Sequence, residues 1–236
     1  MNRTIISSDK SIIPACDVAT LEDFEKIVRA TCDLDGIGGY KVGFELGLGF
    51  GLSSVVDVAR RYTSKPIIYD HQKGGNDIPE MGVNFAGVCK RGGIEAIILF
   101  PFTGPVAQMA WVNAAQDKDL GVIVGGWMTH NGFAQSEGGY ISDEVALRIY
   151  QVAAQAGVNH FVVPGNKLDV LATIRSLVEA EGVEPVFYSP GFVAQGGKID
   201  AAVKIAGDRY HPIVGRGIYL APSLREAALK YTKMLE

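Results

Sequence analysis

Residues 66–79 read PIIYDHQKGGNDIP, a short apolar run that ends in charged side chains. The run at 66–69 has the length and residue types of a buried parallel strand. Asp70, Lys73 and Asp77 follow it, so such a strand delivers these charges to its carboxyl end. The glycines at 74 and 75 favour a tight, irregular turn. Taken alone, the stretch also fits a loop in which Lys73 neutralises two solvated carboxylates.

The alternation of short apolar runs with helical segments continues along the chain. The pattern predicts strands at 12–17, 39–44, 66–70, 95–100, 121–128, 160–165, 185–191 and 211–216, and helices at 21–31, 53–62, 81–90, 105–116, 143–156, 168–181, 199–205 and 222–235. Short apolar strands separated by helices specify a parallel sheet, and eight of them in one chain of this length predict an α/β fold, a (β/α)8 TIM barrel. We expect a single domain over residues 1–236, with 1–11 as a polar lead-in. An open doubly wound sheet is the alternative, but no Gly-x-Gly-x-x-Gly follows the first strand.

Composition narrows the function classes. The chain has 236 residues, of which 47% are hydrophobic and 20% charged, as in ordinary globular proteins. A formal charge of −4 argues against nucleic acid as a partner. No apolar run is long enough to cross a membrane, and the N-terminus lacks a signal-peptide core. Three cysteines without metal-ligand spacing fit free thiols, which predicts a cytoplasmic location.

Polar side chains are concentrated where the predicted strands end. These positions are Asp17, Lys41, Asp70 with Lys73, Thr129 with His130, Pro164, the loop of Gln195, and Arg216. In a (β/α)8 barrel the active site lies at this end of the strands. Acids and lysines gathered at one mouth are costly if they are only buried, so they predict a site for a charged ligand. Asp17 also fits a plain turn before a helix.

The loops after the last two predicted strands have the residues of a phosphate-binding site. Gln195-Gly196-Gly197 and Gly215-Arg216-Gly217 follow the seventh and eighth strands, where barrels of this kind bind phosphate. Backbone N–H groups and one guanidinium match a phosphate dianion. The plainer interpretation is two glycine turns and a surface arginine.

These motifs together resemble the orotidine 5′-monophosphate decarboxylase family. The resemblance runs from about Ile12 to Leu235 and rests on Lys41, on the Asp70, Lys73 and Asp77-Ile78-Pro79 set, on ACD at 15–17, on MTH at 128–130, and on SPGFVAQGG at 189–197 with IVGRGIY at 213–219. Two departures stand out. The family usually spaces its set Asp-x-Lys-x-x-Asp, whereas this chain has one extra residue in each gap, and Met81 stands where many members have Thr.

The resemblance implies decarboxylation of orotidine 5′-monophosphate to uridine 5′-monophosphate without metal or cofactor. It makes Lys73 the stabiliser of the carbanion and the proton donor to C6, with Asp70, Lys41 and Asp77 completing the catalytic charges. It assigns substrate binding to Asp17, Lys41, Ile78, Thr129, Pro164, Gln195, Gly215 and Arg216. It also implies a homodimer in which Asp77 and Ile78 enter the partner's site.

Two other functions remain open on the sequence. A Mg²⁺-dependent sugar-phosphate enzyme such as 3-hexulose-6-phosphate synthase needs an acidic ligand at the end of strand two. The chain has Lys41 there, and only the more distant Glu45 keeps this alternative open. The second alternative is a non-catalytic paralogue that binds a nucleotide phosphate. The altered spacing of the charged set would then indicate lost catalysis. Retention of Lys41, Asp70, Lys73 and Asp77 argues against this alternative.

Overall fold

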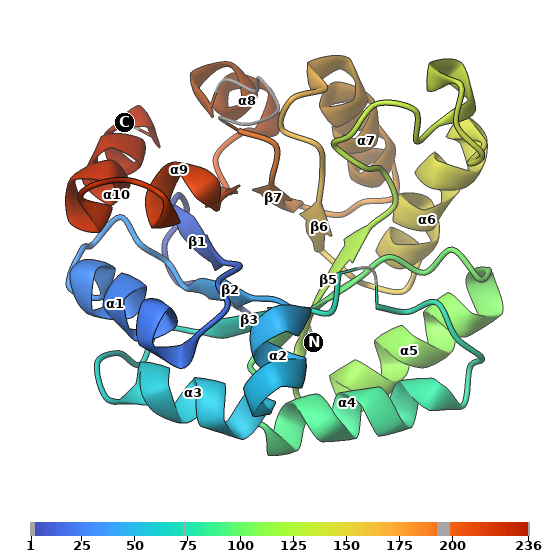
Figure 1. The fold of residues 1–236 in the computed structure, drawn as a ribbon. Helices are drawn as coiled ribbons and strands as arrows, with labels where there is room; N and C mark the ends of the chain where they lie inside the picture. The colour runs from blue at the N-terminus through green and yellow to red at the C-terminus, as the bar shows by residue number, and fades with distance from the viewer. Residues whose placement is uncertain (1–2, 73, 193–198, 236) are drawn as a thin grey trace.

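A closed barrel of parallel strands forms the centre of the molecule, as the sequence predicted (Figure 1). The computed structural model describes residues 3–72, 74–192 and 199–235. Within these, the strands are β1 (Ile13–Cys16), β2 (Tyr40–Val42), β3 (Ile67–Asp70), β4 (Ala96–Leu99), β5 (Gly121–Gly125), β6 (His160–Val162), β7 (Val186–Ser189) and β8 (Tyr210–Val214). Each strand pairs with the next, and β8 pairs with β1 through Ile13 opposite Ile213.

Helices surround the barrel and cover its outer face (Figure 1). They are α1 (Leu21–Thr31), α2 (Phe44–Phe50), α3 (Leu52–Arg60), α4 (Met81–Arg91), α5 (Pro105–Asp117), α6 (Asp143–Gln155), α7 (Leu168–Ala180), α8 (Ile199–Ala206), α9 (Arg216–Tyr219) and α10 (Leu224–Thr232), with short 3-10 turns at Gln135–Glu137 and Lys233–Leu235. The α1 boundaries match the sequence prediction because Thr20 caps the helix, its hydroxyl accepting from the Asp23 N–H at 3.1 Å. Among the described residues, no helix is both long and apolar enough to span a bilayer.

Two short helices differ from the sequence prediction. The α2 segment, FELGLGF, contains glycines that disfavour a helix; the pattern placed Phe44 at the end of a strand and assigned residues 45–50 to no element. Burial of Leu46 holds it against the barrel. At the other end of the chain, β8 ends at Val214, and Arg216 is the first residue of α9 where a strand end was expected.

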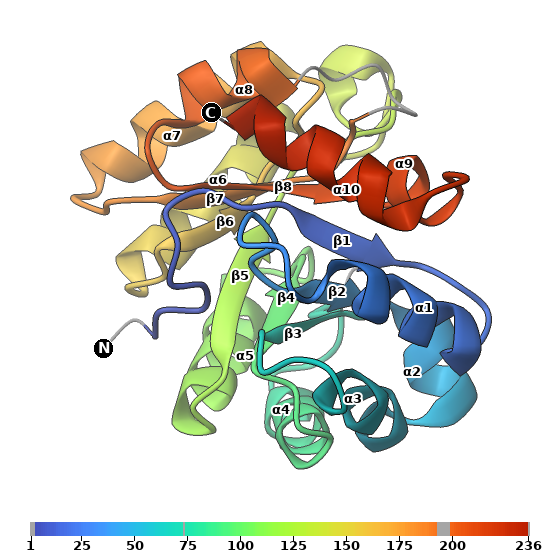
Figure 2. The same cartoon turned by 90° about the vertical axis from the view of Figure 1, so that its left-hand side faces the viewer.

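The N-terminal segment does more than lead into the first strand. Ile5 and Ile6 are buried and pack with side chains of the barrel interior. Figure 2 shows this segment at the opposite end of the barrel from α2 and α9. Two interior histidines are bonded to it: His160 Nε2 lies 3.1 Å from the Arg3 carbonyl, and His211 Nδ1 lies 2.8 Å from Ser11 Oγ. The segment therefore closes the base of the barrel.

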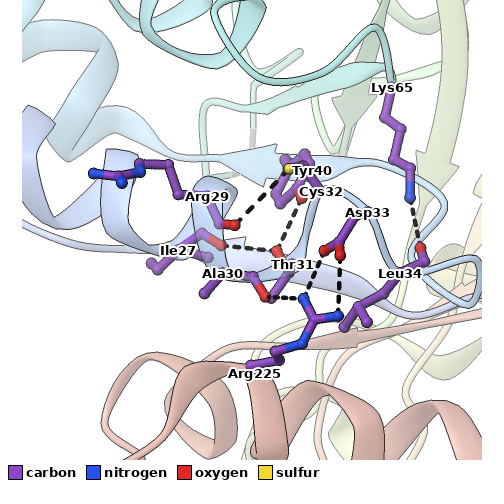
Figure 3. A network of polar contacts seen from close by, with 10 residues as sticks. All are labelled: Ile27, Arg29, Ala30, Thr31, Cys32, Asp33, Leu34, Tyr40, Lys65 and Arg225. Carbon is purple, nitrogen blue, oxygen red and sulfur yellow. Dashed lines mark hydrogen bonds and ion pairs between the residues drawn. The ribbon is translucent and has the colours of Figure 1, made fainter.

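The C-terminal helix is tied to the first helix (Figure 3). Arg225 of α10 donates to both carboxylate oxygens of Asp33, at 2.6 and 3.0 Å, and to the Ala30 carbonyl at 3.2 Å. Lys65 donates to the Leu34 carbonyl at 2.6 Å. These cations satisfy carbonyls at and just beyond the end of α1, which have no partner inside the helix. The Arg225 contacts fix α10 beside the end of α1.

We expect acid to weaken the barrel through its buried histidines. Burial lowers the pKa of His160 to about 4 and that of His211 to about 3, whereas an unfolded histidine titrates near 6.5 (roughly). Their contribution to stability is complete above the unfolded pKa and is lost as pH falls toward the folded pKa, because only the unfolded chain binds the protons. As pH falls from ~6.5 to ~5, the free energy of unfolding should decrease by about 2 kcal/mol for each of these histidines.

Urea unfolding at neutral pH and at pH ~5 measures the effect. The His211→Gln variant should lose less stability than the wild type between the two pH values, and His130→Gln, which changes an exposed histidine, should behave like the wild type. An identical pH dependence in all three proteins would contradict the assignment.

Candidate active site

A cavity of about 340 Å³ opens at the carboxyl ends of the strands. Its lining includes Asp17, Lys41, Asp70, Gln72, Trp127, Met128, Thr129, His130, Phe192, Gly215, Arg216 and Tyr219. Ile98, Phe100, Val162 and Ile213 of the barrel interior also line it. The cavity thus has an apolar floor and a charged rim, the combination of apolar walls and a few placed polar groups that is typical of small-molecule sites.

A buried lysine organises the charged rim. Lys41, on β2, is 5% exposed, and its Nζ lies 2.9 Å from Asp17 Oδ1 and 3.4 Å from Asp70 Oδ2. Burial alone would lower the pKa of Lys41, but the charges of Asp70 and Asp17 outweigh it and leave the pKa raised. Lys41 is therefore protonated at neutral pH. The cluster has one more carboxylate than ammonium, so it favours a further cation or a cationic ligand group nearby.

The second oxygen of Asp70 is held by the chain that follows it. The Gln72 N–H donates to Asp70 Oδ1 at 2.9 Å, and Gln72 Oε1 accepts from the Phe44 N–H at 2.7 Å. Asp70 is 8% exposed and has both oxygens engaged. Its carboxylate is consequently fixed in orientation before any ligand arrives.

Thr129 and His130 follow β5 and border the cavity. The next loop along the barrel supports their backbone, since Asn166 Nδ2 donates to the Thr129 carbonyl at 2.9 Å and Lys167 Nζ donates to the His130 carbonyl at 3.1 Å. Lys167 also pairs with Glu137. This anchoring leaves the Thr129 side chain at the cavity wall, where it was predicted.

Arg216 and Gly215 lie on the far rim, after β8. Within the described part of the chain, Arg216 is exposed and forms no ion pair, which leaves its guanidinium available to an anion. A Cβ at position 215 would approach Tyr219 to 3.3 Å and Ala15 to 3.5 Å, so glycine keeps this rim open. Gln195, expected beside them, lies outside the described residues, as does Lys73.

Three predicted residues do not line this cavity. Pro164 is buried elsewhere in the loop after β6. Asp77 and Ile78 are exposed on the outside of the barrel, with Ile78 at 59%. Their loop is anchored away from the cavity, because Trp111 Nε1 donates to the Ile78 carbonyl at 3.1 Å and the Phe102 N–H donates to Asn76 Oδ1 at 2.9 Å.

A second hollow lies beside this loop. It is a groove of about 740 Å³ lined by Leu48, Tyr69, His71, Asp77, Met81, Phe85, Val88 and Trp111 among others. Leu48 is 72% exposed and Val88 51% exposed, so the groove has apolar edges. We call it the outer groove.

Sequence reasoning missed some residues of the cavity. Gln72 was given no role because it is a neutral residue in a stretch of charged ones, and Phe192 was quoted only as part of the motif at 189–197. Tyr219 was quoted only as part of a motif, although it lines the cavity together with Asp17 and Arg216, and burial followed by the Asp17 charge raises its pKa. Only the register of the strands brings these side chains together.

Metal ligands were not predicted, and the described residues offer few. Nowhere in the described ranges do three His, Cys, Asp or Glu side chains gather in a way that could hold an ion. Glu45, the acid that kept a magnesium site open, is exposed on α2 and does not line the cavity. Both carboxylates of the rim already pair with Lys41.

Comparisons with known proteins agree with the motifs. A family model described as the orotidine 5′-phosphate decarboxylase / HUMPS family matches residues 10–231. The chain is 32% identical over 225 residues to the orotidine 5′-phosphate decarboxylase of Methanosarcina barkeri, covering 95% of this chain and 94% of the relative.

Solved structures show the same relationship. The Methanocaldococcus jannaschii orotidine 5′-monophosphate decarboxylase complexed with the inhibitor BMP superposes with a TM-score of 0.82 at 26% identity, covering 96% of this chain and 99% of that one. The Pyrococcus horikoshii enzyme superposes with a TM-score of 0.76 at 28% identity, covering 95% and 99%.

Proposed function

The chain belongs to the orotidine 5′-phosphate decarboxylase / HUMPS family, and on that premise we propose that it converts orotidine 5′-monophosphate to uridine 5′-monophosphate. The observation that carries the proposal is the Asp17–Lys41–Asp70 cluster at the mouth of the barrel. Lys41 occupies the position on strand two where a Mg²⁺-dependent sugar-phosphate enzyme needs an acidic ligand. The ammonium of a lysine cannot ligate a metal ion.

The reaction sets the demand on the site. Loss of CO2 from C6 of the pyrimidine leaves a carbanion whose lone pair lies in the ring plane, so the ring does not delocalise it. Without a cofactor, fixed positive charge and a proton donor must stabilise it. We assign both roles to Lys73, which follows Asp70 by three residues in the chain. The excess negative charge of the described cluster supports a cation at this place.

The remaining groups bind the substrate. Asp17 and Lys41 would hold the ribose hydroxyls, and Thr129 would meet the amide edge of the pyrimidine. Arg216, Gly215 and Gln195 would hold the phosphate, while Pro164 would support the wall behind it. Binding energy from the phosphate can then be used to organise the reacting end of the site.

We further propose that the active form is a homodimer in which Asp77 and Ile78 complete the partner's site. Their exposure on the outside of their own barrel supports this, as does the apolar edge of the outer groove beside them. Within the described part of its own chain, the Asp77 carboxylate forms no ion pair, and its one hydrogen bond comes from the neighbouring Ile78 N–H at 2.7 Å. A second copy would cover the groove. The three cysteines are free, which supports the cytoplasmic location expected from the sequence.

Decarboxylation should survive chelation. The charges assigned to the transition state are side chains, so orotidylate absorbance should fall at the same rate with and without EDTA when purified protein is added. Complete loss of activity on chelation, with recovery on adding Mg²⁺, would instead favour a sugar-phosphate lyase of the same family.

A further inference from the structure

Gln72 is a residue of the cavity to which the sequence analysis gave no role. It lies in the first gap of the Asp70, Lys73 and Asp77 set, the gap that is one residue longer than the usual family spacing. Its φ is 49°, a left-handed conformation that side-chain-bearing residues rarely adopt. Residues held in this way are often fixed by specific contacts at functional sites.

The contacts of Gln72 connect two strand ends. Its N–H holds one oxygen of Asp70, at 2.9 Å, and its side-chain oxygen accepts from the Phe44 N–H at 2.7 Å. Phe44 begins α2, which follows the strand of Lys41. The same residue thus ties the end of β3 to the end of β2, the two strands that supply Asp70 and Lys41.

The glycine before α2 makes room for this bond. A Cβ at position 43 would lie 2.8 Å from Gln72 Oε1, 3.0 Å from Gln72 Nε2 and 2.9 Å from Asp17 Oδ1. All three distances are below normal contact, so any larger residue would displace the Gln72 amide. Gly43 and Gln72 therefore act as a matched pair.

The far side of Lys73 is anchored as well. The Phe100 N–H donates to the Gly74 carbonyl at 2.8 Å. Both chain neighbours of Lys73 are thus held, one through α2 and the other through the segment after β4. A loop lengthened by one residue in each gap needs such anchors to keep its charges in place.

We propose that Gln72 is a positioning residue, whose side-chain amide ties the ends of β2 and β3 together so that Lys41 and Asp70 meet the substrate in one geometry. The inference rests on the proposed function. It predicts that loss of the side-chain acceptor lowers turnover more than binding, because misplaced reacting groups weaken transition-state contacts first.

Two variants of similar size distinguish the effect of the Gln72–Phe44 hydrogen bond from the effect of the side chain's volume. Gln72→Met keeps the length but has no strong acceptor, whereas Gln72→Glu keeps an acceptor for the Phe44 N–H and adds a carboxylate beside Asp17 and Asp70. Gln116→Ala, which changes an exposed glutamine of α5, is the control. Gln72→Ala replaces the Met variant if that protein fails to fold.

For Gln72→Met we expect kcat to fall by roughly tenfold to a hundredfold, with KM changed by less than about threefold and the melting temperature unchanged. Hydrogen exchange of the Phe44 amide should become fast in Gln72→Met and stay slow in Gln72→Glu. Gln116→Ala should match the wild type in every measurement.

Other outcomes would overturn the inference. A normal kcat with a fast-exchanging Phe44 amide would show that the bond does not position the reacting groups. A rise in KM alone would make Gln72 a substrate contact instead. Failure of the proposed function is distinguishable, because the wild type would then leave orotidylate unchanged while the amide exchange still reported the contact.

Discussion

A mixture of Lys73→Ala and Asp77→Ala chains should regain activity that neither variant has alone. If Asp77 completes the partner's site, each mutant homodimer lacks one charge in every site and should be nearly inactive. A mixed dimer has one site with both lesions and one site with none. Random pairing at equal ratio makes half of the dimers mixed, so activity should reach about a quarter of the wild-type value for a C2 dimer.

The control uses two lesions that belong to the same barrel. Lys73→Ala mixed with Arg216→Ala has no intact site in any dimer, since both residues are proposed to serve the cavity of their own chain. That mixture should stay at the average of the two homodimers. If the Lys73→Ala and Asp77→Ala mixture also stays at that level, the loop of Asp77 serves its own barrel and the shared site must be abandoned.

Arg216→Ala should cost about 2–4 kcal/mol of transition-state stabilisation, a roughly 30-fold to 1000-fold loss of kcat/KM for orotidine 5′-monophosphate. The guanidinium lies on the cavity rim and, among the described residues, has no ion-pair partner. We propose that it binds the phosphate of the substrate. Initial rates over a range of substrate concentrations give the value.

Two comparisons make this prediction specific to phosphate. Unphosphorylated orotidine should be turned over equally by wild type and Arg216→Ala, because it presents no anion to the arginine. Arg216→Lys should fall between them, since it keeps the charge but loses the forked donor geometry. Arg61→Ala, at the exposed end of α3, should have no effect. Equal losses for both substrates would mean that Arg216 supports the fold.

Local sequence determined most of the secondary structure. The runs at 67–70, 96–99 and 121–125 are strands because they are apolar, short and bounded by turn residues. The α1 helix begins at Leu21 because Thr20 can cap it. The positions of Asp17, Lys41 and Asp70 followed in the same way from the apolar runs at 12–17, 39–44 and 66–70. Backbone sterics and side-chain burial act over a few residues, so a linear pattern is enough to specify them.

Other features depended on residues distant in the chain. α2 has an unfavourable composition and forms where Leu46 is buried and Gln72 accepts from Phe44. Ile5 and Ile6 appear in a polar segment, and only closure of the barrel gives them a core to enter. Helix and packing preferences at such places are overruled by tertiary contacts.

The candidate site depends both on local sequence and on contacts between residues distant in the chain. The sequence placed Asp17, Lys41, Asp70 and Arg216 at the mouth of the barrel, and its motifs indicated the family. Only the closed sheet decided that Lys41 lies between Asp17 and Asp70, that Gln72 joins two strand ends, and that Asp77 faces outward. The physical reason is that these contacts arise from the pairing register of neighbouring strands and from loop anchoring, which couple residues far apart in the chain and leave no local signal.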